Sequence, residues 1–205
     1  MRNLFSYFVF LLLIISCNNS SNQNIQNDEE TIKKKTIIIQ PFIGLPKKDI
    51  EFVAHELYKI YTNIEVRNPI VLPKTAYYKS RSRYRADSLI KFLSKLTPTG
   101  YLTIGLTDKD ISATKNNIQD WGLMGLGLCP GNACIASTFR LNKTKKALQL
   151  FKIAIHELGH TEGLKHCPNK NCFMKDAKGK NHTDELTEFC TSCKKILIQK
   201  GWNLK

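Results

Sequence analysis

The stretch HELGHTEGLKH, residues 156–166, constrains the fold of this chain more than any other. Its first two histidines, His156 and His160, are four residues apart, and the preceding residues 144–155 have apolar side chains at helical spacing. This spacing places both imidazoles on one face of a helix, one turn apart, so both can bind the same ion. Glu157 lies at the rim of that face, where its carboxylate can hold a water without binding the metal.

The residues after this helix predict a sharp turn and a third ligand. Gly163 can adopt the left-handed conformation that ends a helix, which would bring His166 back toward the same ion. Taken singly, Gly163 is an ordinary helix end and His166 a surface histidine. Together with the two helical histidines they complete HExxHxxGxxH. Three neutral imidazoles leave one tetrahedral position open, which is typical of catalytic zinc.

The N-terminal residues 1–16 are predicted to lie outside the fold. An apolar run over residues 4–15 has the length of a secretory h-region and is short for a membrane span. The following Ser16-Cys17 resembles the lipobox of bacterial lipoproteins, which implies a lipid on Cys17; an ordinary signal peptide cut nearby is the alternative. Residues 17–35 are polar and aperiodic, so we expect a flexible tether before a domain at 36–205.

Six cysteines remain once Cys17 is set aside, and an exported chain favours disulfides. Four of the six have the spacing CxxxxC followed by CxxC, which suits a closed four-thiolate zinc site as well as two disulfides. These four are Cys167, Cys172, Cys190 and Cys193. The other two, Cys129 and Cys134, bracket the turn-rich CPGNAC and can either close a small disulfide or remain free thiols.

The 205 residues suffice for one domain, and its elements alternate. Strands are predicted at 36–40, 63–68 and 101–107, helices at 46–61, 82–96 and 144–160, and a strand-loop-strand unit at a sheet edge over 121–141. This order predicts an α/β (α+β) fold with a mixed or parallel sheet.

The net charge of +14 could attract nucleic acid or anionic lipid. Lysines are scattered through every segment, however, and no basic run is interleaved with stacking aromatics. We therefore expect a solvated lysine-rich exterior and no nucleic-acid partner.

A family resemblance emerges when the motif is followed further along the chain. HELGHTEGLKH resembles the metzincin metallopeptidases. Its continuation, in which Cys167 directly follows His166 and Cys172, Met174 and the CTSC of residues 190–193 come later, resembles the archaemetzincin signature. Weaker similarity extends through 71–90, 106–111 and 137–141, so the resemblance covers roughly residues 36–200. The lipoprotein leader and CPGNAC are not general features of that family.

The resemblance implies a metzincin-type mixed β-sheet with an active-site helix and a C-terminal helical subdomain. It implies two zinc ions, one catalytic on His156, His160 and His166 and one structural on the four-cysteine set. Met174 would form a Met-turn, an apolar base beneath the histidines, although a thioether can also simply fill the core. Residues 133–141, ACIASTFRL, would be the edge strand that pairs with an extended substrate.

These observations predict a zinc-dependent metallopeptidase in which Glu157 is the general base. The alternative is a catalytically inactive, zinc-containing envelope lipoprotein that binds peptides or polyanions. In either case we expect a peptide or protein partner, attachment to the membrane through the lipid on Cys17, location in the bacterial cell envelope, and a monomer.

Overall fold

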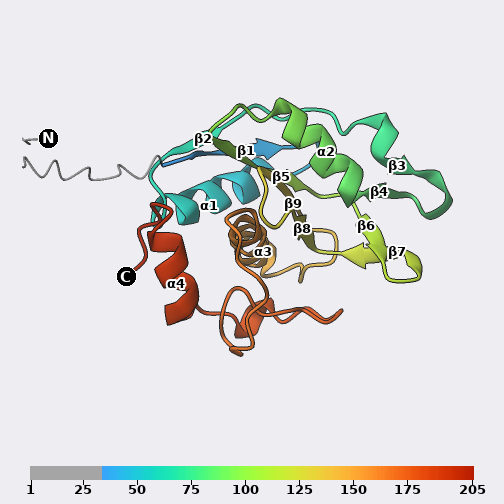
Figure 1. Ribbon diagram of the computed structural model, residues 1–205. Helices are drawn as coiled ribbons and strands as arrows, with labels where there is room; N and C mark the ends of the chain where they lie inside the picture. Colours follow the sequence, from blue (N-terminus) through green and yellow to red (C-terminus); the bar gives the residue numbers. More distant parts are fainter. Residues whose placement is uncertain (1–33) are drawn as a thin grey trace, which may run out of the picture. The chain divides into compact units, whose positions relative to one another are not determined.

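The computed structural model describes residues 34–205. The predicted leader at 1–16, the lipidation site Cys17 and the tether up to residue 33 lie outside the described residues. The larger of two sheets has five strands in the order β2-β1-β5-β9-β8, all parallel except β8, which runs antiparallel to β9 (Figure 1). The strands are β1 (Thr36–Pro41), β2 (Ile64–Val66), β5 (Tyr101–Thr107), β8 (Gly125–Gly127) and β9 (Ala133–Ser137).

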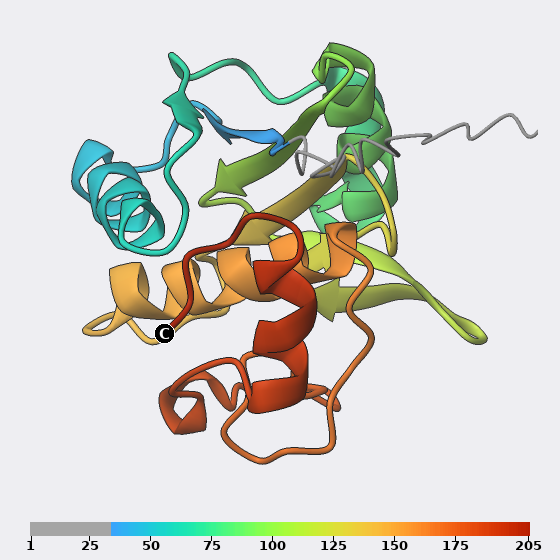
Figure 2. The ribbon, with the colours of Figure 1, turned by 60° about the vertical axis from the view of Figure 1, so that its left-hand side comes forward.

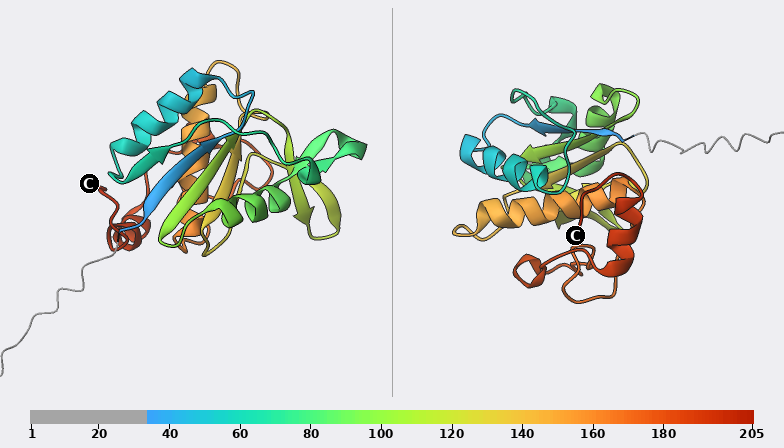
Figure 3. Two further views of the ribbon diagram at one scale, coloured as in Figure 1. Left: turned by 90° about the horizontal axis from the view of Figure 1, so that it is seen from above. Right: turned by 90° about the vertical axis from the view of Figure 1, so that its left-hand side faces the viewer.

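Helices cover both faces of this sheet, as its alternating side chains require. α1 (Lys47–Tyr58) and α3 (Lys146–Thr161) lie on one side, and α2 (Ala86–Leu96) lies on the other (Figures 1 and 3). Ile104 of β5 packs into the core that contains α1 and α3, whereas Ile135 of β9 packs into the core that contains α2. The predicted mixed sheet with flanking helices is confirmed.

A second sheet was not anticipated from the sequence. Its strand order is β3-β4-β6-β7, formed by β3 (Tyr77–Tyr78), β4 (Arg83–Arg85), β6 (Ile111–Lys115) and β7 (Ile118–Leu123), and short 3-10 turns at Lys74–Ala76 and Lys79–Arg81 flank β3. The prediction of one helix over 82–96 is therefore wrong at its start. Tyr84 packs against Tyr77 in a tilted arrangement, with ring centroids 5.1 Å apart, and Arg83 donates to Asp120 at 2.9 Å. These long-range contacts hold the segment extended, so the helix begins only at Ala86.

The chain after α3 forms the C-terminal region that contains the four cysteines. It follows a long looped path on the side of α3 away from the sheet and ends with α4 (Thr191–Ile198), and its one short 3-10 turn is Thr183–Glu185 (Figure 2). Phe189 and Leu197 join the core beneath α3. The predicted C-terminal subdomain is present, with a single α-helix.

Lys34 and Lys35 contact the residues that follow α1 and α3. The Tyr61 hydroxyl donates to the Lys35 carbonyl at 2.6 Å, and Lys34 Nζ donates to Thr62 at 2.8 Å. Lys35 Nζ lies 3.3 Å from the buried carboxylate of Glu162. Within residues 34–205, no helix has both the length and the apolar character needed to cross a membrane.

Candidate metal centres and the cleft between two walls

Helix α3 carries two of the three histidines, and its end brings the third to them. The helix ends after Thr161, and Gly163 follows with φ of +97°, the left-handed conformation predicted for it. The amide of Gly163 donates to the carbonyl of His160 at 2.8 Å, and that of Leu164 donates to Gly159 at 3.0 Å. The chain therefore reverses direction, and His166 returns to the face that bears His156 and His160.

The three imidazoles converge with one nitrogen of each helical histidine left free. His156 Nδ1 lies 2.6 Å from the Phe173 carbonyl, and His160 Nδ1 lies 2.7 Å from the Leu164 carbonyl. These carbonyls fix Nδ1 as the protonated nitrogen, so each Nε2 presents a lone pair. The two Nε2 atoms are 3.1 Å apart. Two nitrogens bound to one tetrahedral zinc would be separated by about 3.3 Å, given Zn–N bonds of roughly 2.0–2.1 Å.

His166 completes the set. Its ring centroid lies 5.4 Å from that of His156 and 4.8 Å from that of His160, and one ligand atom from each histidine lies within 4.8 Å of the others. Burial and the neighbouring His160 lower the pKa of His156 to about 4, and burial lowers that of His160. Both shifts favour the neutral imidazole, the form that binds a metal. The donor set therefore fits one zinc ion.

Glu157 is buried beside this set, and two glycines make room for it. Burial raises the pKa of Glu157 to about 8. A Cβ at Gly125 would lie 2.5 Å from Glu157 Oε1, and one at Gly127 would lie 2.7 Å from the Glu157 carbonyl oxygen. Only glycine therefore lets β8 lie directly over this turn of α3. This role of Gly125 and Gly127 was not predicted, although two glycines within the apolar segment GLMGLGL are a signal of close backbone approach.

Met174 lies against the helix turn that carries the histidines. Its side chain is fully buried, and a Cβ at Gly159 would lie 2.5 Å from its Sδ. Gly159 lies between His156 and His160 in the sequence, so the thioether contacts the backbone beneath them. This position suits an apolar base for the site and also fills the core.

The four C-terminal cysteines converge on one point. Cys167 Sγ lies 3.6 Å from Cys190 Sγ, and Cys172 Sγ lies 3.8 Å from Cys193 Sγ. All four are free thiols. A disulfide would need a separation of about 2.05 Å, whereas thiolates on one tetrahedral zinc are about 3.8 Å apart, given Zn–S bonds of roughly 2.3 Å. The spacing therefore suits a closed zinc site.

The groups around these thiols shift their pKa values in opposite directions. The backbone amides of Met174 and Cys190 both donate to Cys172 Sγ, at 3.4 and 3.3 Å. The Cys193 amide lowers the pKa of Cys190 to about 7, whereas burial raises the pKa of Cys172 and of Cys193. A bound cation would therefore be needed to ionise all four thiols near neutral pH.

The two candidate centres are joined by very short pieces of chain. His166 and Cys167 are consecutive, and Cys172 directly precedes Phe173, whose carbonyl contacts His156. The amide of Cys167 also donates to the carbonyl of Met174 at 2.8 Å. Whatever fixes the four-cysteine cluster therefore also fixes one histidine ligand and the hydrogen-bond partner of another.

Cys129 and Cys134 do not form the suggested disulfide; both are free. Cys134 is buried in β9 with its side chain in the core shared with α3, because side chains alternate along the strand. Cys129 is exposed, and its Sγ donates to the Leu164 carbonyl at 3.4 Å. The two thiols therefore lie in different environments, Cys134 in the core and Cys129 at the surface.

An open cleft of about 500 Å³ contains the histidines and Glu157. One wall is the β-sheet side, residues 121–127, and the other is the loop wall, which we define as residues 175–186. The strand expected to pair with substrate was misplaced: β9 already pairs with β5 and with β8. The sheet has edge strands β2 and β8, and β8 is the one that lines the cleft.

The chain resembles one family along most of its length. The sequence model of Peptidase family M54 matches residues 44–199. The archaemetzincin of Haloquadratum walsbyi is 31% identical over 173 residues, covering 78% of this chain and 97% of that protein. The archaemetzincin of Archaeoglobus fulgidus is 34% identical over 166 residues, covering 77% and 95%.

Solved structures agree with the sequence relatives. The crystal structure of archaemetzincin from Methanopyrus kandleri matches with a TM-score of 0.70 and 26% identity, covering 82% of this chain and 96% of that one. The structure from Archaeoglobus fulgidus, complexed with malonate, matches with a TM-score of 0.65 and 30% identity, covering 78% and 99%.

Proposed function

Because this chain belongs to peptidase family M54, the archaemetzincins, and is a zinc metallopeptidase, we propose that it hydrolyses peptide bonds with Glu157 as the general base. His156, His160 and His166 would hold the catalytic zinc. The observation that carries the proposal is the 3.1 Å separation of the two free Nε2 atoms, each oriented by a carbonyl on its Nδ1.

Zinc at this position would lower the pKa of a water at its open site and polarise the scissile carbonyl. The chain supplies the proton transfers. The carboxylate oxygens of Glu157, next to the first histidine, take the proton from the attacking water and later give it to the leaving amine. Burial raises the pKa of this carboxyl, which strengthens it as a proton acceptor.

The edge strand β8 offers a way to orient the substrate. It lies at the end of the sheet, lines the cleft, and has glycines on the side facing Glu157. An extended peptide that pairs with β8 through main-chain hydrogen bonds would pass directly over the site. Pairing with the backbone requires no particular side chain, so specificity must come from elsewhere in the cleft.

The four-cysteine cluster would hold a second, structural zinc. The Sγ separations of 3.6 and 3.8 Å and the two amide donors to Cys172 support this assignment. Its role would be to anchor the loops that carry His166 and Phe173.

We also propose that the domain is tethered to the membrane of a bacterial cell envelope through a lipid on Cys17, acts as a monomer, and cleaves peptides or proteins there. The support is the apolar run followed directly by Cys17. Cys17→Ala should release the protein from the membrane fraction, and an unchanged distribution would contradict the anchor.

The decisive experiment combines metal analysis with a peptide assay on the same full-length sample. We expect bound zinc, cleavage of some members of a diverse peptide set, loss of cleavage with a chelator, and its return with added zinc. Bound zinc with no cleavage of any peptide would instead favour the inactive peptide- or polyanion-binding protein.

A further inference from the structure

The loop wall of the cleft, residues 175–186, separates its charged side chains by sign. Its sequence KDAKGKNHTDEL contains three lysines and three carboxylates. All three lysines line the cleft, with Asp176 as the one carboxylate among them. Neither Asp184 nor Glu185 lines the cleft. The fold therefore turns the positive part of this loop toward the substrate site.

Both excluded carboxylates have partners, Asp184 at helix α3 and Glu185 within the loop wall itself. Asp184 accepts from Gln149 Nε2 and from Lys145 Nζ, each at 2.9 Å. Glu185 accepts from Lys175 at 2.7 Å and contacts His182 Nδ1 at 2.7 Å. Both carboxylates are therefore occupied, and Lys175 is neutralised locally.

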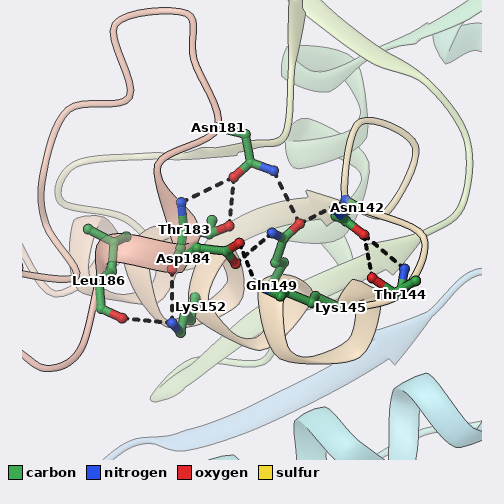
Figure 4. Close-up of polar contacts among 9 residues, drawn as sticks. All are labelled: Asn142, Thr144, Lys145, Gln149, Lys152, Asn181, Thr183, Asp184 and Leu186. Atoms are coloured by element: carbon green, nitrogen blue, oxygen red, sulfur yellow. Dashed lines mark hydrogen bonds and ion pairs between the residues drawn. The ribbon is translucent and has the colours of Figure 1, made fainter.

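A buried glutamine holds this arrangement in place. Gln149 of α3 is only 3% exposed and lies among Asn142, Asn181 and Asp184 (Figure 4). Its Oε1 accepts from the Asn142 amide at 2.8 Å and from Asn181 Nδ2 at 3.1 Å. Lys152, one turn further along α3, donates to the carbonyls of Thr183 and Leu186 at 2.9 and 2.7 Å. The wall is thus bonded to the helix that carries His156.

Two basic residues outside the loop wall also line the cleft. Lys115 lines the cleft with its Nζ over the Trp121 ring, 5.2 Å from the centroid. Arg140 also lines it but is paired with Asp110 at 2.8 Å. Among residues 34–205, Lys115, Lys178 and Lys180 form no ion pair within 4 Å.

Asp176 offsets part of this charge. The backbone amide of Lys178 lowers the pKa of Asp176, and His166, Lys115 and Lys178 lower it further. In the described part of the chain, Asp176 and Glu157 are the carboxylates that line the cleft without an ion pair, against three unpaired ammonium groups, so an excess of positive charge remains next to the histidines.

We propose that this cleft selects peptides with acidic side chains, which bind against Lys178 and Lys180 of the loop wall and Lys115 of β6. The inference rests on the proposed function only in taking the cleft as the substrate site. Because the lysines are exposed, the attraction is moderate and screened by salt, and it gives specificity more than affinity.

The test measures binding separately from cleavage. Full-length Glu157→Gln protein, loaded with zinc, is titrated with three fluorescent peptides that differ only at two positions, which are Glu, Gln or Lys. At low ionic strength we expect the Glu peptide to bind about tenfold more tightly than the Lys peptide, and the ratio to fall toward one in about 0.5 M salt, where the screening length is only a few ångströms.

Two double variants, each made in the Glu157→Gln protein, test whether the lysines of the cleft cause the preference. Lys178→Gln with Lys180→Gln should reduce the Glu-to-Lys ratio at least threefold. Lys91→Gln with Lys95→Gln removes two exposed lysines of α2 outside the cleft and should leave the ratio unchanged. An equal effect of both pairs would attribute the preference to net charge and overturn the proposal.

Three further results would also support or overturn the selection of acidic peptides. Equal affinity for the three peptides, or an oligonucleotide that binds as tightly as the Glu peptide, would overturn acidic-peptide selection. A clear preference in the Glu157→Gln protein, with no cleavage by the wild type, would support the cleft assignment while contradicting the proposed hydrolysis.

Discussion

At the scale of single residues, a substitution of Glu157 should have the most specific effect, a loss of activity without a loss of zinc. Glu157→Gln keeps the shape of the side chain but removes the proton acceptor, so kcat/KM should fall by about 10²–10⁴ while zinc content stays the same. Peptide hydrolysis and metal analysis on one preparation check this. Glu51→Gln, an exposed position on α1, is the matched control. Wild-type rates in the Glu157→Gln protein would show that another group is the base.

A second prediction for a single residue concerns Tyr61 and the pH dependence of the stability of the fold. Burial, with a contribution from Glu162, raises its pKa from 10.0 to about 12. The folded state therefore favours the neutral phenol, and this stabilisation is complete below pH 10 and is lost as the pH rises to 12. The loss amounts to about 2–3 kcal/mol, from roughly 1.4 kcal/mol per pKa unit.

Tyr61→Phe isolates this contribution from that of other groups that titrate at high pH. The variant loses the hydrogen bond to Lys35, so it should be about 1 kcal/mol less stable at pH 8. Between pH 10 and 12 it should lose less stability than the wild type does. Urea unfolding at several pH values measures the difference, and a constant difference would disagree with the raised pKa.

At the scale of elements, the contact of β8 with α3 depends on glycine. A Cβ at Gly127 would lie 2.7 Å from the backbone oxygen of Glu157, which cannot move without shifting the helix. Gly127→Ala should therefore displace β8 and lower kcat/KM by about tenfold or more, the effect expected for small misplacements near the chemistry. Gly100→Ala, at φ of +83° with open space around it, controls for destabilisation alone. Equal activity losses in both variants would argue against the packing explanation.

The loop wall and α3 form a second pair of coupled elements. Gln149→Ala removes the acceptor of the Asn142 amide and of Asn181 Nδ2 and one of the two donors to Asp184, which should cost about 1–3 kcal/mol of stability. In the remaining folded protein the wall loses its fixed position. KM for acidic peptides should rise severalfold with little change in kcat or zinc content. Gln199→Ala, exposed after α4, is the control. A fall in kcat at unchanged KM would contradict the positioning role.

At the scale of the whole molecule, the C-terminal region relies on its cysteines. It has one α-helix of eight residues, and its cluster joins points from residue 167 to residue 193. Two zinc atoms and four protected thiols are expected per chain. Removing the cluster's zinc and blocking the thiols should lower Tm by roughly 10 °C or more, because each kcal/mol shifts Tm by about 2–4 °C.

The same treatment should also abolish activity, since His166 and Phe173 adjoin the cluster. Zinc added back while the thiols stay blocked should refill the histidine site without restoring full rates. One zinc per chain, with no thiols becoming reactive after chelation beyond those of Cys129 and Cys134, would show disulfides in place of the second metal.

Local geometry explains why much of this protein could be predicted from its sequence. The relation of His156 to His160 follows from 3.6 residues per turn, and the reversal at Gly163 follows from the conformational freedom of glycine. The helices α1 and α3 and the strands β1 and β5 follow from apolar periodicity over one continuous segment. In each case the information lies within a few neighbouring residues.

The features that could not be predicted from the sequence depend on contacts between distant segments. Residues 83–85 are extended because Tyr77 and Asp120 hold them, and β8 rather than β9 is the edge strand because of the order in which strands pair. Cys129 and Cys134 lie apart because one faces the cleft and the other the core. The orientation of the loop lysines depends on Gln149 in a different element. Periodicity states which face of a segment is buried, but not which partner covers it, and partner choice depends on the burial and hydrogen bonding of the whole chain.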